Sequence, residues 1–416
     1  MIRTDGLAGG ITLVTEAMGD VASACVGFWV GTGGRDEAPE AAGASHFLEH
    51  VLFKGTPTWS ARAIAEAVDA VGGEMNAFTA REYTGFYVRL LAHDLDLGLD
   101  ILCDIMSAPA LRPEEVDAER QVILEEILMH ADEPADLVHE TSAAALFPGH
   151  PLGRDVLGTE TSVGAMGVDD IRAFFDHHYR PANMVVSVAG RIDHDSVAEG
   201  LARRLAGRAG GERPVREPPG EDLGPLVVTS RPTEQAHLVV AVRGPARHDK
   251  LRFPLDVLNH VLGGGLSSRL FQEIREQRGL AYSVYSDRVA YDDAGVLSVY
   301  VGTAPAKVHE VLALVRDELD ELVSDGVTEA ELGVAKGYLR AQTLLALEDS
   351  GARMSRIGRS QLVHGEVLSV DELVARVEAV TLDDVLVAAR QVLGGPRSLA
   401  VVGPFGEADF DPDMVG

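Results

Sequence analysis

Hydrophobic and polar residues follow two kinds of pattern along the first half of the chain. Short runs rich in β-branched and aromatic residues, bounded by turn residues, predict β-strands. Longer stretches in which hydrophobic residues recur every three or four positions predict amphipathic helices. The predicted strands are 11–14, 22–30, 75–79, 83–88 and 183–190, and the predicted helices are 46–52, 60–71, 93–107 and 113–128. This mixture, with two strands joined as a hairpin, predicts an α+β fold in which a mainly antiparallel sheet is packed with helices.

The second half of the chain repeats the first, with a period of about 210 residues. The matching pairs are 236–244 with 22–31, 256–263 with 46–52 and the turn after it, 335–342 with 119–126, and 398–403 with 185–190. Residues 209–225 are rich in glycine, proline and charge, a composition typical of a linker. We therefore predict two homologous domains, 1–208 and 226–416, joined by this linker, with regular structure beginning near Ile11.

One predicted helix carries the residues His46, Glu49 and His50. Helical residues three and four apart share a face, so these side chains project together while Leu48 and Leu52 face the core. Two imidazoles one turn apart can hold a metal ion, and a carboxylate beside them can act as a general base toward water. The order H-x-x-E-H is the inverzincin motif. Alone, the motif could equally be the solvated face of an amphipathic helix.

A zinc site needs a third protein ligand, and the helix that begins at Pro113 offers candidates. Glu119 and Glu126 are seven residues apart and share a face. The local pattern does not decide between Glu125 and Glu126 as the ligand. In the second repeat, the positions that match His46, Glu49, His50 and Glu126 are Asp256, Asn259, His260 and Gln342. The sequence therefore predicts one metal site per chain and a structural role for His260.

Charge and cysteine content limit the partners and the compartment. The chain has 416 residues and a net charge of -29, which argues against nucleic acid or an anionic membrane surface as partner. Cationic or extended peptides suit this charge, although a solvated acidic surface accounts for much of it. Cys25 and Cys103 lie among apolar residues, which predicts buried free thiols and a cytoplasmic location. No apolar run is long enough to span a membrane, and no leader segment is evident at the start.

Taken together, the motifs resemble the pitrilysin, insulinase and mitochondrial processing peptidase family of zinc peptidases. They resemble in particular the bacterial members that are built as half of a clamshell. The stretches that carry the resemblance are 46–56, 72–77, 119–126 and 262–285. The resemblance implies two homologous α+β domains and a Zn²⁺ ion held by His46, His50 and Glu126. It also implies that Glu49 is the catalytic base and that Glu119 belongs to the catalytic site as a supporting residue.

The resemblance also implies how substrate is bound. Arg275 and Tyr282 match an arginine–tyrosine pair that holds the substrate near the metal. A strand at the edge of the first sheet is expected to bind a peptide by β-augmentation. Its residues are Asn76, Ala77, Phe78 and Thr79.

The predicted function is a zinc-dependent endopeptidase that cleaves unfolded peptides inside a clamshell chamber. One chain supplies half of such a chamber, so the resemblance implies a homodimer in which Arg275 and Tyr282 act on the zinc site of the other copy. A heterodimer with a paralogue is the alternative assembly. The alternative function is a non-catalytic peptide-binding or assembly subunit of a heteromeric processing peptidase. Neither nucleic acid nor a membrane is an expected partner.

Overall fold

The computed structural model describes residues 2–7, 9–207, 209–411 and 414, so that the predicted domain ends at 1, 208 and 416 lie outside the described residues. The chain divides into two compact units whose sequence segments interleave. The first unit comprises Met1–Ile127, Asp155–Arg216 and Leu345–Leu368, and the second comprises Leu128–Arg154, Glu217–Leu344 and Ser369–Gly416. Each unit therefore contains most of one predicted domain and a segment from the other half of the sequence.

The first unit is built on a six-stranded sheet with strand order β1-β2-β6-β3-β5-β4. Strands β2 and β6 run parallel, and the other neighbours run antiparallel. The strands are β1 (Ile2–Gly6), β2 (Thr12–Ala17), β3 (Ser23–Val30), β4 (Glu74–Thr79), β5 (Thr84–Leu91) and β6 (Met184–Gly190). The predicted strands of this half are present, but the expectation that structure begins near Ile11 is wrong. Strand β1 is an edge strand with mostly exposed residues, so it lacks the hydrophobic alternation that would have revealed it.

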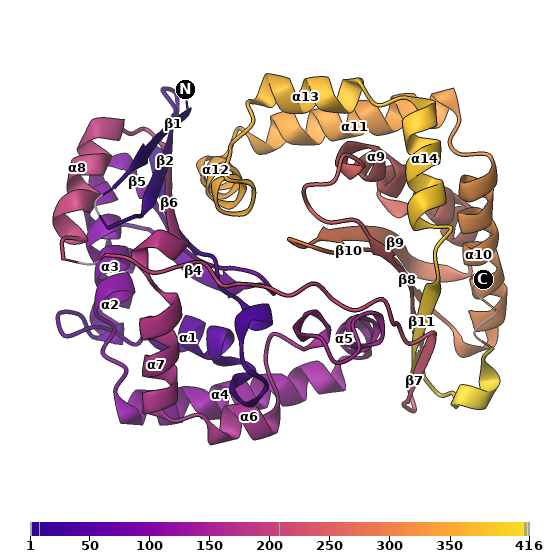
Figure 1. Cartoon of the computed structure of the whole chain (residues 1–416), viewed down its shortest axis with the longest axis horizontal. Helices are drawn as coiled ribbons and strands as arrows, with labels where there is room; N and C mark the ends of the chain where they lie inside the picture. The colour runs from indigo at the N-terminus through magenta and orange to yellow at the C-terminus, as the bar shows by residue number, and fades with distance from the viewer. Residues whose placement is uncertain (1, 8, 208, 412–413, 415–416) are drawn as a thin grey trace. The chain divides into compact units, whose positions relative to one another are not determined.

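Helices cover one face of this sheet and enclose the main hydrophobic core of the unit (Figure 1). Core residues come from the strands, such as Val26 and Phe28, and from the apolar sides of helices, such as Phe47 and Ile123. The helices are α1 (Ala44–Leu52), α2 (Ala61–Ala70), α3 (Leu95–Ser107), α4 (Pro113–Asp132), α6 (Glu160–Ala165), α7 (Val168–His178) and α8 (His194–Arg204). The first four match the helices that the sequence predicts, and their apolar residues lie in this core.

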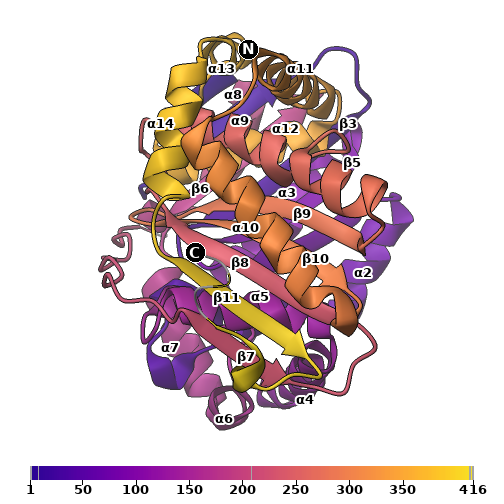
Figure 2. The same ribbon diagram turned by 90° about the vertical axis from the view of Figure 1, so that its right-hand side faces the viewer.

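The second unit repeats this architecture with a five-stranded sheet of order β7-β11-β8-β10-β9, in which β7 and β11 run parallel (Figure 2). Without β1, the first sheet has the same topology, so two homologous α+β domains are confirmed. The strands are β7 (Leu226–Ser230), β8 (Ala236–Gly244), β9 (Ala281–Ala290), β10 (Gly295–Thr303) and β11 (Arg397–Gly403). The helices of this half are α9 (Arg252–Gly263), α10 (Val308–Ser324), α11 (Glu329–Ala346), α13 (Val370–Glu378) and α14 (Leu382–Val392).

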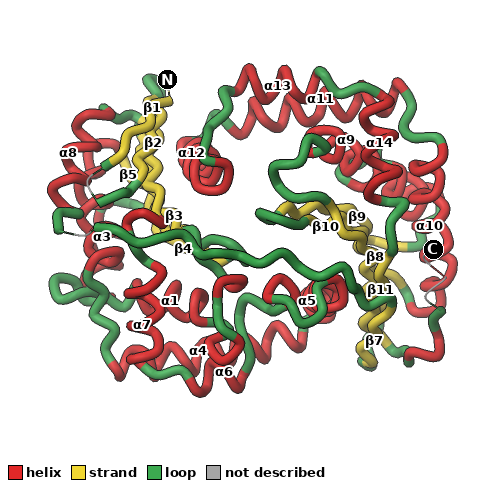
Figure 3. Tube along the Cα trace, viewed as in Figure 1, coloured by secondary structure: helices red, strands yellow, loops and turns green. Residues whose placement is uncertain are grey.

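The second face of each sheet is covered by a helix from the opposite half of the sequence. Helix α12 (Ser350–His364) packs on β3 and β6 of the first sheet, where Met354 shares a buried cluster with Cys25 and Trp29 (Figures 1 and 3). Helix α5 (Pro134–Leu146) packs on β8 and β11 of the second sheet. Each sheet is therefore buried on both faces only because the two halves of the chain exchange a helix.

Two further sequence expectations concern the linker and the membrane. Within the described part of 209–225, the chain forms neither helix nor strand, as the green trace between α8 and β7 shows (Figure 3). Among the described residues, no helix combines the length and the hydropathy that crossing a bilayer requires. Cys25 and Cys103 are buried free thiols, as predicted.

Candidate metal centre

Helix α1 is held in place by contacts at its N-terminus. Glu37 accepts hydrogen bonds from the backbone N–H groups of Gly43 and Ser45, both at 2.7 Å, and so satisfies donors of the first turn. Gly43 has a φ of 93°. A Cβ atom at this position would lie 2.6 Å from the carbonyl oxygen of Leu157, so glycine is required. The apolar side of α1 is buried in the core, which fixes the direction of its polar side.

The polar side of α1 and one face of α4 bring His46, His50 and Glu126 together. The Oε2 atom of Glu126 lies 3.6 Å from Nε2 of His46 and 3.6 Å from Nε2 of His50. One ligand atom of each residue lies within 4.8 Å of the other two. Tetrahedral zinc with bonds of about 2.0–2.2 Å holds its ligand atoms about 3.4 Å apart. The two nitrogens and one oxygen therefore fit a Zn²⁺ ion, whereas Glu125 is exposed and is not part of this group.

Glu119 lies about two helical turns before Glu126 on α4 and supports this group through His50. Its Oε2 atom lies 3.1 Å from Nδ1 of His50, and its Oε1 atom lies 2.6 Å from Nζ of Lys54. A carboxylate that accepts from Nδ1 fixes the imidazole ring and leaves Nε2 of His50 to face a metal. Lys54 was not singled out from the sequence, although it follows His50 by four residues. Glu119 thus contacts a candidate ligand rather than the candidate metal position.

Glu49 is partly buried beside the two histidines. The hydroxyl of Thr79 donates a hydrogen bond of 2.6 Å to Oε2 of Glu49. Burial raises the pKa of Glu49, and the hydrogen bond from Thr79 and the charge of His50 act in the opposite direction. Thr79 was predicted to bind substrate as part of the edge strand. Its side chain reaches the candidate catalytic base, a contact that no local pattern in the sequence reveals.

Comparison with known proteins identifies the family of the chain. The model of the insulinase family, peptidase family M16, matches residues 12–160, and the model described as the peptidase M16 inactive domain matches residues 165–339. An uncharacterized zinc protease from Streptomyces coelicolor is 48% identical over 417 residues, which cover 97% of this chain and 90% of that protein. The chain belongs to the M16 peptidase family. The resemblance drawn from the sequence motifs is thereby confirmed.

Two solved structures share the fold of this M16 chain. A protease from Helicobacter pylori matches with a TM-score of 0.89 and 22% identity, covering 97% of this chain and 99% of that one. A peptidase M16 inactive domain from Pseudomonas fluorescens matches with a TM-score of 0.91 and 20% identity, covering 98% of both chains. At these identities the likeness shows a shared two-domain fold and carries no conclusion about activity.

The predicted peptide-binding strand of this M16 chain is β4, which pairs with β5 and, in the described part of the chain, has no strand on its other side. Asn76 is exposed, and its side chain accepts a hydrogen bond of 2.8 Å from the N–H of Ala77. Ala77 is buried in the core. Phe78 packs edge-on against Trp29, with ring centroids 5.8 Å apart. The free edge fits β-augmentation by backbone contacts, whereas the side chains of Ala77 and Phe78 pack inside the unit.

The predicted arginine–tyrosine pair lies in the second unit. Arg275 belongs to the π-helical segment Phe271–Gln277, and Tyr282 is near the start of β9. The guanidinium carbon of Arg275 lies 4.8 Å from the ring centroid of Tyr282, so the two side chains meet as a cation–π pair. The ring of Tyr282 is 79% exposed and available to a ligand. The seven-residue spacing alone did not reveal this contact.

The second repeat holds no comparable group of three ligands among the residues that the structure describes. Asp256, which matches the candidate ligand His46, forms an ion pair of 2.8 Å with Arg288 and is therefore paired with a side-chain cation. His260 stacks on Tyr338, with ring centroids 4.1 Å apart. A Cβ atom at Gly265 would lie 2.8 Å from the His260 ring, so the glycine-rich loop packs directly on it. These contacts give His260 a packing role in this M16 chain.

Proposed function

We propose that this M16 protein is a zinc-dependent endopeptidase that cleaves unfolded peptides. The observation that carries the proposal is the grouping of His46, His50 and Glu126 around one position, with Glu49 beside them. Structural zinc sites are usually closed by four protein ligands, whereas three ligands leave a position for water and substrate. The Streptomyces coelicolor relative is named as a zinc protease, which supports the same metal and reaction class.

The chain supplies the proton chemistry through Glu49. Bound Zn²⁺ would act as a Lewis acid that acidifies water and polarises a peptide carbonyl. Glu49 accepts the proton of the attacking water and delivers it to the amine of the leaving peptide. Thr79 fixes one carboxylate oxygen by its hydrogen bond, which limits rotation of the base.

The substrate in this proposal is an extended peptide that adds to the free edge of β4. The peptide backbone pairs with β4, the strand that contains Asn76 and Thr79. Thr79, the last residue of this strand, contacts Glu49, so the bound peptide lies beside the strand that reaches the base. An unfolded peptide can supply such a strand, because its backbone N–H and C=O groups are not already paired within a fold. The net charge of -29 supports a preference for cationic peptides, because the protein's field attracts them at low ionic strength.

We further propose that two copies assemble, with Arg275 and Tyr282 of one copy acting on peptide bound at the zinc site of the other. The basis is the resemblance to larger family members, in which one chain supplies both halves of the clamshell. Complementation tests this assembly. Glu49→Gln and Tyr282→Phe variants, each inactive alone, should regain partial activity after subunit exchange, because one mixed site carries neither defect. No recovery after verified exchange would contradict action between copies. The buried free thiols support a cytoplasmic location for this assembly.

Metal titration tests the proposed activity itself. Protein stripped by a chelator should cleave a quenched unfolded peptide only after zinc is added, with a plateau at one zinc per chain. Glu126→Gln should bind zinc more weakly, whereas Glu125→Gln, which alters the exposed neighbour, should behave as wild type. One zinc bound per chain without cleavage of any unfolded peptide would favour the alternative, a non-catalytic peptide-binding subunit.

A further inference from the structure

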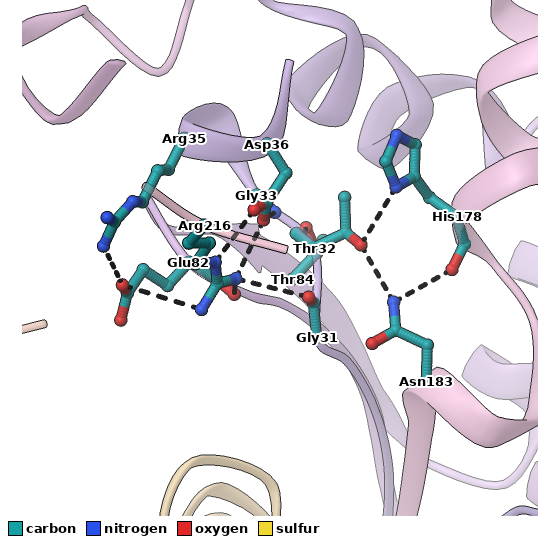
Figure 4. Close-up of polar contacts among 10 residues, drawn as sticks. All are labelled: Gly31, Thr32, Gly33, Arg35, Asp36, Glu82, Thr84, His178, Asn183 and Arg216. Carbon is teal, nitrogen blue, oxygen red and sulfur yellow. Dashed lines mark hydrogen bonds and ion pairs between the residues drawn. The ribbon is translucent and has the colours of Figure 1, made fainter. Parts of the chain in front are cut away.

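Arg216 is the last residue of the first unit, where the chain leaves it to enter the second. Its guanidinium group forms a two-pronged ion pair with Asp36, with Nε to Oδ1 and Nη2 to Oδ2 both at 2.8 Å (Figure 4). The same group donates to the carbonyl oxygens of Glu82 at 2.7 Å and of Gly31 at 3.3 Å. The linker is therefore fixed to the first unit by four hydrogen bonds from one side chain.

Glu82 lies in the turn that joins β4 to β5, and this turn is held on both sides. Its carboxylate forms an ion pair of 2.7 Å with Arg35, and both side chains are only 2% exposed (Figure 4). The backbone of the turn also pairs with the segment before α1, since the N–H of Gly34 donates to Ala80 and the N–H of Arg35 donates to Arg81. A Cβ atom at Gly33 would lie 2.1 Å from the carbonyl oxygen of Ala80, so the two segments are in the closest possible contact.

The residue immediately before this turn is Thr79, whose hydroxyl donates to the carboxylate of Glu49. A continuous set of contacts therefore leads from the linker to the candidate base, through Arg216, the turn 80–82 and Thr79. We infer that Arg216 is a positioning residue for Glu49. The inference rests on the proposed peptidase function and deepens it, because it makes the seating of the linker a condition for correct placement of the base.

Lysine cannot replace arginine in this role. The planar guanidinium of Arg216 serves a carboxylate through two parallel bonds and two carbonyl oxygens at once, whereas an ammonium group is a single point charge. Arg216→Lys keeps the positive charge beside Asp36, whose side chain is 2% exposed, so it avoids leaving this buried carboxylate without the cation that it pairs with. Arg216→Lys removes the paired hydrogen bonds to Asp36 and is therefore the variant to test.

A double-mutant cycle measures whether Arg216 acts through Thr79. We expect Thr79→Val to lower kcat by about 10- to 100-fold, because a small displacement of a general base from its correct position has effects of this size. Arg216→Lys should lower kcat by about 10-fold in the wild-type background and by less than about twofold in the Thr79→Val background. Thr79→Ser should restore sensitivity to Arg216→Lys, since serine keeps the hydroxyl. Equal losses in both backgrounds, or an unchanged kcat in Arg216→Lys alone, would overturn the inference.

Two controls separate this role from general destabilisation and from failure of the proposed function. Arg213→Lys alters the same linker at a residue that donates to the carbonyl oxygen of Leu362 on α12, and it should leave kcat unchanged. Hydrogen exchange of the peptide that spans Ala80–Tyr83 reads the turn directly, because the N–H of Ala80 donates to Tyr83. Faster exchange in Arg216→Lys is expected whether or not the protein cleaves peptides, and unchanged exchange would overturn the inference. Absence of cleavage by the wild type would instead refute the proposed function.

Discussion

The substitution Glu119→Gln tests whether the residue behind His50 tunes the metal site. Glu119 is 8% exposed and contacts His50 Nδ1 at 3.1 Å and Lys54 Nζ at 2.6 Å. Glutamine has the same size, and its amide oxygen can still accept from Nδ1. The change therefore removes the negative charge while keeping the shape of the site.

The expected effect is a weaker affinity for zinc. Loss of a carboxylate that supports a metal-binding histidine typically costs 10- to 100-fold in metal affinity, which corresponds to about 1.4–2.8 kcal/mol. We expect the lower half of this range, because the amide oxygen of the Glu119→Gln variant keeps the ring of His50 oriented and only its basicity falls. The side chain of Lys54 is 34% exposed, so its ammonium group can be hydrated when its partner becomes neutral.

Competitive titration against a chelator of known affinity gives the zinc dissociation constant without reference to activity. Glu125→Gln is the matched control, because it removes the same charge from an exposed position on the same helix. The dissociation constant should rise about 10-fold for Glu119→Gln and less than about twofold for Glu125→Gln. Wild-type affinity in Glu119→Gln, or equal weakening in both variants, would refute the assignment of Glu119 as a supporting residue.

Three further predictions concern packing, pH and substrate charge. Met354→Ala should destabilise the first unit by about 2–5 kcal/mol, measured by denaturant unfolding, because the side chain is fully buried between α12 and β3. Burial lowers the pKa of His178 to about 4, so the stability that it contributes above pH 6.5 is lost as the pH falls toward 4. His178→Asn should therefore reduce the acid sensitivity of the unfolding free energy over this range. Finally, the ratio of cleavage rates for matched cationic and anionic peptides should exceed one at low salt and fall toward one as salt rises.

The fold was largely predictable because its periodic elements carry their own signal. Strands such as β3 and β6 are buried on both faces and read as continuous hydrophobic runs, and α1 shows its polar and apolar sides in nine residues. Two strands of the second sheet, β8 and β11, followed from the repeat. Strand β1 was missed because edge strands with solvated residues resemble loops in sequence.

The exchange of α5 and α12 could not be predicted, since an amphipathic helix shows that one side is buried but not which sheet buries it. The same limit applies to the candidate site. Two histidines four residues apart predict their own proximity, but a local pattern could not choose between Glu125 and Glu126, and the resemblance supplied that choice. The contacts of Glu49 with Thr79 and of Arg216 with the turn 80–82 join residues distant in sequence, and only the folded chain shows them.

The general-base role of Glu49 is the central claim, and the Glu49→Gln variant tests it most directly. Zinc content and cleavage of a quenched unfolded peptide are measured on the same preparation. The ligands His46, His50 and Glu126 are untouched, so the variant should bind one zinc per chain with an affinity close to that of the wild type. Cleavage should fall by at least about 100-fold, because the group that accepts the proton of water is gone. Cleavage at the wild-type rate by the zinc-loaded variant would contradict the account.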